Sequence, residues 1–206
     1  MKLAVIVLAA GNSKRFGSNK LFYEIDGEKM YQRTLETVGE LCACMDIAAT
    51  VVTQYEEIAA AAREQDFSVV YNAHPEEGIS SSLKLGLAAN LEADACLFAV
   101  SDQPWLSADT LKSLIEVWRA SGKGIACAAV NGIPGNPCIF SAAYFPIYHN
   151  IRCCPALFQA CPCFHINPSI LRDAVTAYLK QPLHLLQDLK IVPACTVSAC
   201  ADNNLM

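Results

Sequence analysis

The feature that decides the fold lies near the amino terminus, where residues 3–20 read LAVIVLAAGNSKRFGSNK. The first six of these residues are apolar, and three of them are β-branched, which is typical of a buried strand in a parallel sheet. The residues that follow are small or polar and include Gly11 and Gly17, so the strand runs into a glycine-bearing loop. This segment therefore predicts a strand whose loop opens at the carboxyl edge of a sheet.

Beyond this segment, apolar runs of strand length alternate with stretches of helical period as far as about residue 130. The pattern predicts strands at 47–52, 68–71, 95–100 and 124–130, and helices at 30–41, 56–64, 80–89 and 108–120. Such alternation indicates parallel βαβ units in a layered α/β domain. Turn signals at 131–132 and 134–137 interrupt it before a short strand at 138–140, and a further helix is expected at 169–180. The 206 residues fit one domain.

The composition restricts the classes of partner. A net charge of −5 gives no basic field for nucleic acid, although Lys14, Arg15 and Lys20 together suit a single triphosphate. The apolar start faintly resembles a signal peptide, but it is short and leads directly into a charged loop. No other stretch approaches the length of about 20 apolar residues that spans a bilayer. We expect a soluble, cytoplasmic protein with no membrane partner.

Cysteine is abundant, with eleven residues, six of them after residue 150. An odd count in a chain of this size favours reduced thiols over a disulfide framework. The pair Cys153-Cys154 and the run Cys161-Pro162-Cys163 invite a metal hypothesis, although they lack the paired C-x-x-C spacing of common zinc sites. Buried thiols that act as small apolar residues are the alternative.

The loop at 9–20 has the chemistry of a phosphate cradle. Gly11 and Gly17 permit a close approach of the backbone, while Lys14, Arg15 and Lys20 supply positive charge. The spacing matches neither the Walker A pattern nor the dinucleotide G-x-G-x-x-G pattern. On spacing alone, a solvated strand-to-helix loop remains an equal alternative.

Two later segments also carry candidate chemistry. Asp102 follows a strand that is apolar up to Val100, so its carboxylate is expected at the crevice beyond the strand ends, where it suits Mg²⁺. A strand-ending turn at 101–104 is the alternative. Three serines, Ser80, Ser81 and Ser82, begin a predicted helix, where free amides and hydroxyls suit an anion or a base edge, or simply cap the helix.

The loop resembles a known family signature, L-A-A-G-x-S-x-R-[FM]-G-x-x-K, which is found in nucleotidyltransferases of the Rossmann-like, glycosyltransferase-A type fold. Within this group the chain is most similar to molybdenum-cofactor cytidylyltransferases, because three further segments follow in order at 77–83 (EGISSSL), 101–104 (SDQP) and 132–137 (GIPGNP). The resemblance covers residues 3 to about 145. It implies a three-layer α/β fold, with a mostly parallel sheet and helices on both faces.

The resemblance also implies roles for individual residues. Nucleotide binding falls to Leu8, Ala9, Ala10, Gly11, Ser13, Gly78, Ser80, Ser81 and Ser82. Acceptor binding falls to Gln103, Gly135, Asn136 and Pro137. In the mechanism so implied, Arg15 and Lys20 bind the triphosphate, Asp102 holds Mg²⁺, and a phosphate of the second substrate attacks the α-phosphorus. The Ala9-Ala10-Gly11 form goes with cytidine in the family, so CTP is the expected nucleotide.

The resemblance weakens after residue 148. A G-D-x-G-[GA] segment and a second acidic motif of the family align with 150–154 and 173–179, where Ile151 and Val175 replace expected aspartates. Asp173 is a weak second candidate for the metal. Three functions follow as hypotheses: cytidylyl transfer to molybdopterin, nucleotidyl transfer to a sugar phosphate or another small phosphate with GTP in place of CTP, and a non-catalytic chaperone that delivers molybdopterin to a molybdenum hydroxylase.

Overall fold

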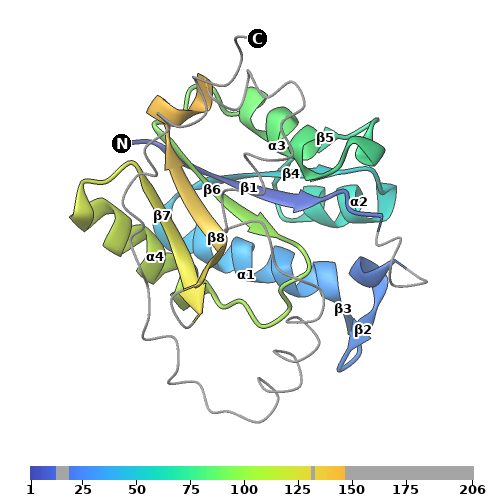
Figure 1. The fold of residues 1–206 in the computed structure, drawn as a ribbon. Helices are drawn as coiled ribbons and strands as arrows, with labels where there is room; N and C mark the ends of the chain where they lie inside the picture. The colour runs from blue at the N-terminus through green and yellow to red at the C-terminus, as the bar shows by residue number, and fades with distance from the viewer. Residues whose placement is uncertain (13–18, 131–132, 147–206) are drawn as a thin grey trace, which may run out of the picture.

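The computed structural model describes residues 1–12, 19–130 and 133–146. Its main sheet has six strands in the order β5-β4-β1-β6-β8-β7 (Figure 1). The strands are β1 (Leu3–Ala9), β4 (Ala48–Thr53), β5 (Ser68–Tyr71), β6 (Ala95–Val100), β7 (Ile125–Val130) and β8 (Ile133–Ser141). The first four in this order are parallel, while β8 runs antiparallel to both β6 and β7. The expected α/β fold with a mostly parallel sheet is confirmed.

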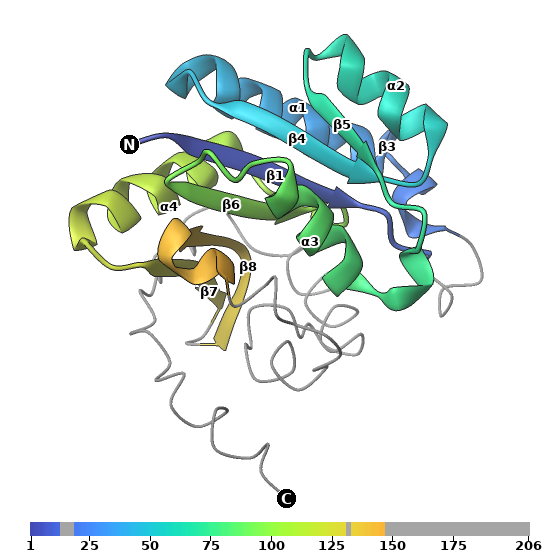
Figure 2. The ribbon, with the colours of Figure 1, turned by 90° about the horizontal axis from the view of Figure 1, so that it is seen from above.

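Helices cover both faces of the sheet (Figures 1 and 2). One face carries α1 (Met30–Met45), α2 (Glu56–Glu64) and α4 (Ala108–Ser121), and the other carries α3 (Ile79–Ala88). Short 3-10 turns occur at η1 (Lys20–Phe22), η2 (Pro75–Glu77) and η3 (Ala142–Tyr144). None of the helices in the described part of the chain has the length and apolar character needed to cross a bilayer.

Strand β1 lies at the centre of the sheet and contributes to both cores. Val5 and Val7 face the α1, α2 and α4 side, whereas Ile6 and Leu8 face the α3 side. All four residues are buried, because neighbours in a strand point to opposite faces and both faces are covered by helices. This double burial explains the continuous apolar run at the start of the sequence.

A small hairpin that the sequence analysis did not anticipate lies between η1 and α1. It consists of β2 (Glu24–Ile25) and β3 (Glu28–Lys29), which pair antiparallel. The turn residues Asp26 and Gly27 have φ angles of 53° and 85°. Two positive φ angles are what a two-residue hairpin turn requires, and Asp-Gly is a favoured pair there.

Two expected boundaries were wrong. Helix α1 continues to Met45 instead of stopping near residue 41, and it ends where Asp46 adopts a left-handed conformation with φ 53°. Strand β8 includes 134–137, which were expected to form a turn. Strand β8 pairs with β6 only from Cys138 onward. Pro134 and Pro137, which have no backbone N–H to donate, therefore lie outside that ladder.

Candidate functional site

The candidate site lies along the carboxyl edge of the four parallel strands. Strands β5, β4, β1 and β6 are neighbours in this order, and they end at Tyr71, Thr53, Ala9 and Val100. Parallel neighbours bring their following loops to one edge of the sheet, which is where ligands bind in open α/β sheets. The described residues that follow β1, β4, β5 and β6 therefore lie at one edge of the sheet.

The beginning of the glycine-bearing loop is held by its neighbours on both sides. The Ser101 hydroxyl and backbone N–H both donate to the Leu8 carbonyl, at 3.0 and 3.1 Å. From β4, the Thr53 hydroxyl donates to the Ala9 carbonyl at 3.0 Å, and the Gln54 amide donates to the Ala10 carbonyl at 2.7 Å. These bonds fix the backbone at the point where it leaves the sheet.

Gly11 is the first residue of this loop that is open to a ligand. It is exposed, whereas Leu8, Ala9 and Ala10 are buried. A Cβ placed on Gly11 would meet no atom of the described residues within 4 Å. A phosphate can therefore approach the backbone here at close range.

An ion pair joins the far end of the loop to the end of β6. The Lys20 ammonium contacts the Asp102 carboxylate, although the two residues are 82 positions apart in sequence. Both side chains are partly buried, with 28% and 24% of their surface exposed. Asn19 precedes Lys20 and caps η1, because its side chain accepts a hydrogen bond from Leu21 N–H at 3.2 Å. The site thus places one cation and one carboxylate side by side, within reach of solvent.

The serines at the start of α3 have different environments. Asn72, the residue after β5, accepts a hydrogen bond from the Ser81 hydroxyl at 3.0 Å and donates one to the Ser82 hydroxyl at 2.9 Å. Asn72 and both serines are buried, so these hydroxyls fasten α3 to the strand edge. Ser80 is partly exposed and donates to the Glu77 carbonyl at 3.3 Å, and Gly78 beside it is exposed with φ 84°. Gly78 and Ser80 are the members of this group that a ligand can reach.

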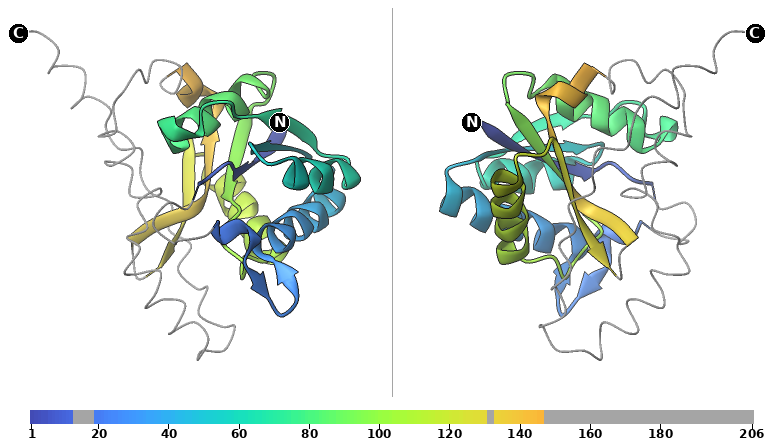
Figure 3. Two further views of the ribbon diagram at one scale, coloured as in Figure 1. Left: turned by 90° about the vertical axis from the view of Figure 1, so that its right-hand side faces the viewer. Right: turned by 60° about the vertical axis from the view of Figure 1, so that its left-hand side comes forward.

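The expected acceptor-binding residues meet at the junction of β6 and β8. The Gln103 Nε2 donates to the Asn136 carbonyl at 3.1 Å. The register between β7 and β8 shifts at this point: Cys127 pairs with Cys138 and Ala129 pairs with Pro134, so Gly135, Asn136 and Pro137 lie opposite Ala128 alone. Figure 3 shows β7 and β8 in side view. A bulge of this kind re-aims the backbone, which is common beside functional sites.

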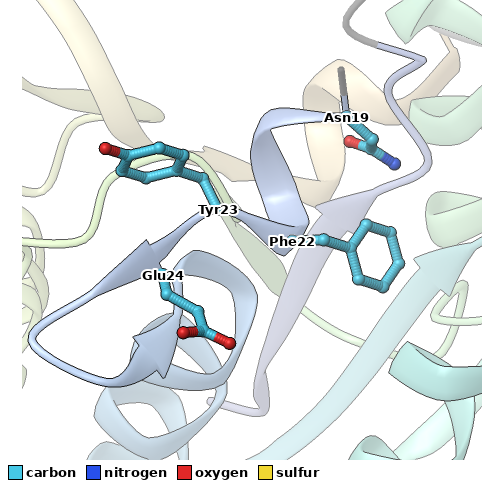
Figure 4. A pocket seen from close by; sticks show the side chains of 4 residues that line it. All are labelled: Asn19, Phe22, Tyr23 and Glu24. Atoms are coloured by element: carbon cyan, nitrogen blue, oxygen red, sulfur yellow. The ribbon is translucent and has the colours of Figure 1, made fainter.

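The chain after the loop forms a shallow hollow lined by Asn19, Phe22, Tyr23 and Glu24 (Figure 4). Phe22 and Tyr23 point to opposite sides of the chain. Tyr23 is 57% exposed, whereas the Phe22 ring packs edge-on against Tyr31 and Tyr55. The hollow lies beside the candidate site. The packing of Phe22 against Tyr31 and Tyr55 holds η1 in place.

Asp102 is a carboxylate at this edge that could contribute to a metal site. In residues 1–12, 19–130 and 133–146, no group of three or more His, Cys, Asp or Glu is placed to hold a metal. A cation at Asp102 would draw on this carboxylate together with phosphate oxygens and water, which is the set that Mg²⁺ prefers. The partial exposure of Asp102 fits that use.

Five cysteines lie in the described ranges, namely Cys42, Cys44, Cys96, Cys127 and Cys138. Cys96, Cys127 and Cys138 are buried, and burial raises the pKa of the Cys96 thiol to about 12. The Cys138 thiol donates to Asn136 Oδ1 at 3.6 Å. The six cysteines after residue 150 lie outside the described residues, and so do Ser13, Arg15 and Asp173 among the expected site residues.

Three residues at the site were missed by the sequence analysis, namely Gln54, Tyr55 and Asn72. Gln54 and Asn72 directly follow the parallel strands β4 and β5, and Tyr55 comes one residue after Gln54, all at the same edge as Asp102. Their position after a predicted strand was the available signal, but none carries a charge or a glycine that would have drawn attention to it. Gln54 and Tyr55 hold the start of the glycine-bearing loop, and Asn72 holds the start of α3.

Comparison with known proteins places these observations in a family. The profile of the "MobA-like NTP transferase domain" matches residues 5–154. The chain is 36% identical over 129 residues to the bifunctional protein GlmU of Bifidobacterium longum (strain NCC 2705), a match that covers 59% of this chain and 28% of GlmU. It is 24% identical over 153 residues to the molybdenum cofactor cytidylyltransferase of Escherichia coli (strain K12), covering 71% and 77% of the two chains. The chain thus spans less than a third of the GlmU relative.

Solved structures agree on the fold. The crystal structure of Rv0371c from Mycobacterium tuberculosis H37Rv superposes with a TM-score of 0.62 at 23% identity. The superposition covers 78% of this chain and 81% of that one. At this sequence identity the similarity shows a shared fold and no more.

Proposed function

The chain belongs to the MobA-like NTP transferase domain family, and on that premise we propose that it transfers CMP from CTP to the phosphate of molybdopterin with release of pyrophosphate. Membership makes the protein a nucleotidyltransferase by family, while the choice of CTP and molybdopterin is the proposal. It is supported by the similarity to the E. coli cytidylyltransferase and by the Ala9-Ala10-Gly11 form of the loop. The observation that carries it is the contact between Lys20 and Asp102 at the loop end.

The proposed reaction needs positioning and charge stabilisation more than covalent chemistry. A phosphate oxygen of the acceptor forms a bond to the α-phosphorus of CTP, and the bond from that phosphorus to the bridging oxygen breaks. Pyrophosphate leaves with the electron pair. The backbone at Gly11 and the Lys20 ammonium bind the triphosphate, together with Arg15 and Ser13 from the loop.

Asp102 has a second partner in this proposal, because its carboxylate would hold Mg²⁺ when nucleotide is bound. The cation would neutralise charge on the α-phosphate and on the leaving pyrophosphate. The Lys20 ammonium would bind the phosphates beside it. Gln103, from the loop after β6, and Asn136, from the β8 bulge, face the acceptor in this proposal. Gly78 and Ser80 face the nucleotide from the start of α3.

The test is release of pyrophosphate from CTP in the presence of Mg²⁺ and a molybdopterin-loaded partner. Asp102→Asn should lower kcat by at least about 100-fold, since it removes a charge that acts in the transition state. Chelation of Mg²⁺ with EDTA should abolish release. Asp109→Asn is a matched control, because Asp109 is exposed on the first turn of α4. Equal rates for Asp102→Asn and the wild type would remove Asp102 from the mechanism.

The same assay separates the alternative functions. Turnover with GTP in place of CTP, or with a sugar phosphate in place of molybdopterin, would keep the chemistry and change the substrates. Binding of CTP at micromolar concentration without pyrophosphate release under any acceptor would favour a carrier of molybdopterin. A ligand at 100 times its dissociation constant stabilises the folded state by about 2.7 kcal/mol, so thermal shift readily detects such binding.

A further inference from the structure

The side chain of Tyr55 lies between the two ends of the glycine-bearing loop. On one side its hydroxyl is 3.1 Å from the Gly11 carbonyl and 3.2 Å from Asn12 Oδ1, and it can donate its proton to either. On the other side its ring contacts Phe22 of η1, the turn that Asn19 caps. One side chain from the β4 loop thus touches the residues before and after 13–18.

The ring of Tyr55 is itself held firmly. It packs edge-on against Phe22 of η1, with ring centroids 5.2 Å apart and an interplanar angle of 87°. Its backbone N–H donates to the Thr53 hydroxyl at 3.1 Å, and its carbonyl accepts from Ala59 N–H at 3.0 Å in the first turn of α2. The hydroxyl therefore has a position that is set by β4, α2 and η1, and not by the loop.

A second set of contacts supports the packing of Tyr55 on Phe22. Phe22 also packs edge-on against Tyr31 at 5.6 Å, and the Tyr31 hydroxyl donates to Glu57 Oε1 at 2.8 Å. Lys29 pairs with the same carboxylate. The bonds from Lys29 and Tyr31 lower the pKa of Glu57, so the carboxylate is charged at neutral pH. Burial, followed by the bond to Glu57, raises the pKa of Tyr31, so its hydroxyl stays protonated as a donor.

We propose that Tyr55 is a positioning residue for the nucleotide, because it joins Gly11 and Asn12, through its hydroxyl, to the η1 turn that begins at Lys20, through its ring. The backbone at Gly11 and the ammonium of Lys20 are the two described groups that would meet the triphosphate, and Tyr55 ties both to one rigid point. Preorganised groups bind more tightly because less freedom is lost on binding. This inference rests on the proposed nucleotide site and adds to it a residue that need not touch the substrate.

The sharpest test is Tyr55→Phe, which keeps the ring packing on Phe22 and removes only the hydroxyl. The Kd for CTP with Mg²⁺, measured by isothermal titration calorimetry, should rise roughly three- to tenfold, as expected for the loss of about one hydrogen bond. In turnover, KM for CTP should rise by the same factor while kcat changes by less than about twofold. A purely structural role would lower Tm and leave Kd unchanged.

Tyr71→Phe is the matched control. Its hydroxyl also has side-chain partners, Glu56 and Arg63 of α2, but all three side chains are exposed, and within the described residues none of them hydrogen-bonds to Gly11, Asn12 or η1. We expect wild-type affinity for CTP from this variant. A double-mutant cycle with Asn12→Ala should show non-additive effects on Kd, since Asn12 and Tyr55 share a bond.

The outcomes distinguish this inference from the proposed function. Wild-type affinity in Tyr55→Phe, together with binding of CTP by the wild type, overturns the role of Tyr55 and leaves the nucleotide site intact. Failure of the wild-type protein to bind CTP, GTP, UTP or ATP overturns both. Should Tyr55→Phe fold poorly, additive effects of Asn12→Ala and Phe22→Leu on Kd would contradict the link across the loop, because Tyr55 contacts both residues.

Discussion

Gln103 shows at the scale of one residue how a site can be left ready for a ligand. Its Nε2 is used, because it donates to the Asn136 carbonyl at 3.1 Å. Its Oε1 is buried and has no hydrogen-bond partner among the residues that the structure describes. A buried acceptor without a partner costs about 1–3 kcal/mol, and such exceptions call for an explanation. We take the missing partner to be an N–H or O–H group of the acceptor substrate.

Gln103→Ala is therefore expected to raise KM for the acceptor by about tenfold while leaving the Kd for CTP unchanged. Initial rates at varied acceptor concentration measure the first quantity, and calorimetry measures the second. Gln65→Ala is the control, because Gln65 lies after α2 at the opposite edge of the sheet. If KM for the acceptor stays at its wild-type value, Gln103 does not bind the acceptor.

The residues of the site were predictable from sequence to different degrees. Lys20 and Asp102 stand out as a cation and a carboxylate that follow apolar strands, and the rule for parallel sheets assigns them to one edge. Their direct contact depends on β1 and β6 being neighbours, which the sequence does not state. Tyr55 and Gln54 were not predictable, because their role arises from hydrogen bonds to a distant loop and not from their residue type.

At the scale of elements, the packing of α3 on the sheet depends on a missing side chain. Gly86 lies in the middle of α3 and is buried against β1 and β4. A Cβ at this position would come within 2.5 Å of Ile6 Cγ2 and 3.2 Å of Val52 Cγ2. Both atoms belong to short, branched side chains of buried strands, which cannot move aside easily. The glycine lets the helix approach the sheet closely.

Gly86→Ala should therefore destabilise the protein, although alanine is the better helix former by about 0.8–1 kcal/mol. Overpacking of a tight core costs about 1–3 kcal/mol, so we expect a net loss of about 1 kcal/mol. Urea unfolding followed by circular dichroism measures it. Ala88→Ser, on the exposed side of the same helix, should change stability by no more than about 0.5 kcal/mol. A stabilised Gly86→Ala protein would contradict this account of the packing.

Most elements up to β7 were predictable, because each has a clear period and its flanking turns are marked. The errors lie where local signals and tertiary structure disagree. Residues 134–137 carry two prolines and a glycine, which are local signals for a turn. They nevertheless belong to β8, because β8 pairs with β7 on both sides of the bulge at 135–137 and with β6 from Cys138 onward. The hairpin after η1 has strands of two residues each, which are too short to show a period.

At the scale of the whole molecule, two apolar cores share one sheet. Leu35 of α1 and Leu83 of α3 are each 1% exposed, and they lie on opposite faces of the sheet. Neighbouring residues of β1 belong to different cores. Loss of either core would therefore expose one apolar face of the shared sheet to water. This arrangement predicts that the described part of the chain unfolds as one cooperative unit.

The prediction is testable with two substitutions of the same chemistry on opposite faces. Leu35→Ala and Leu83→Ala should each cost about 2–5 kcal/mol, because each leaves a cavity in a closely packed core. In a Trp105→Phe background, Trp118 is the remaining tryptophan, and it is buried in the core that contains Leu35. Its fluorescence and the far-ultraviolet circular dichroism should give coincident urea transitions in both variants, with unchanged m values. If Leu83→Ala shifted the circular dichroism transition to lower urea and left the Trp118 transition in place, the two faces would be separate folding units that merely share strands.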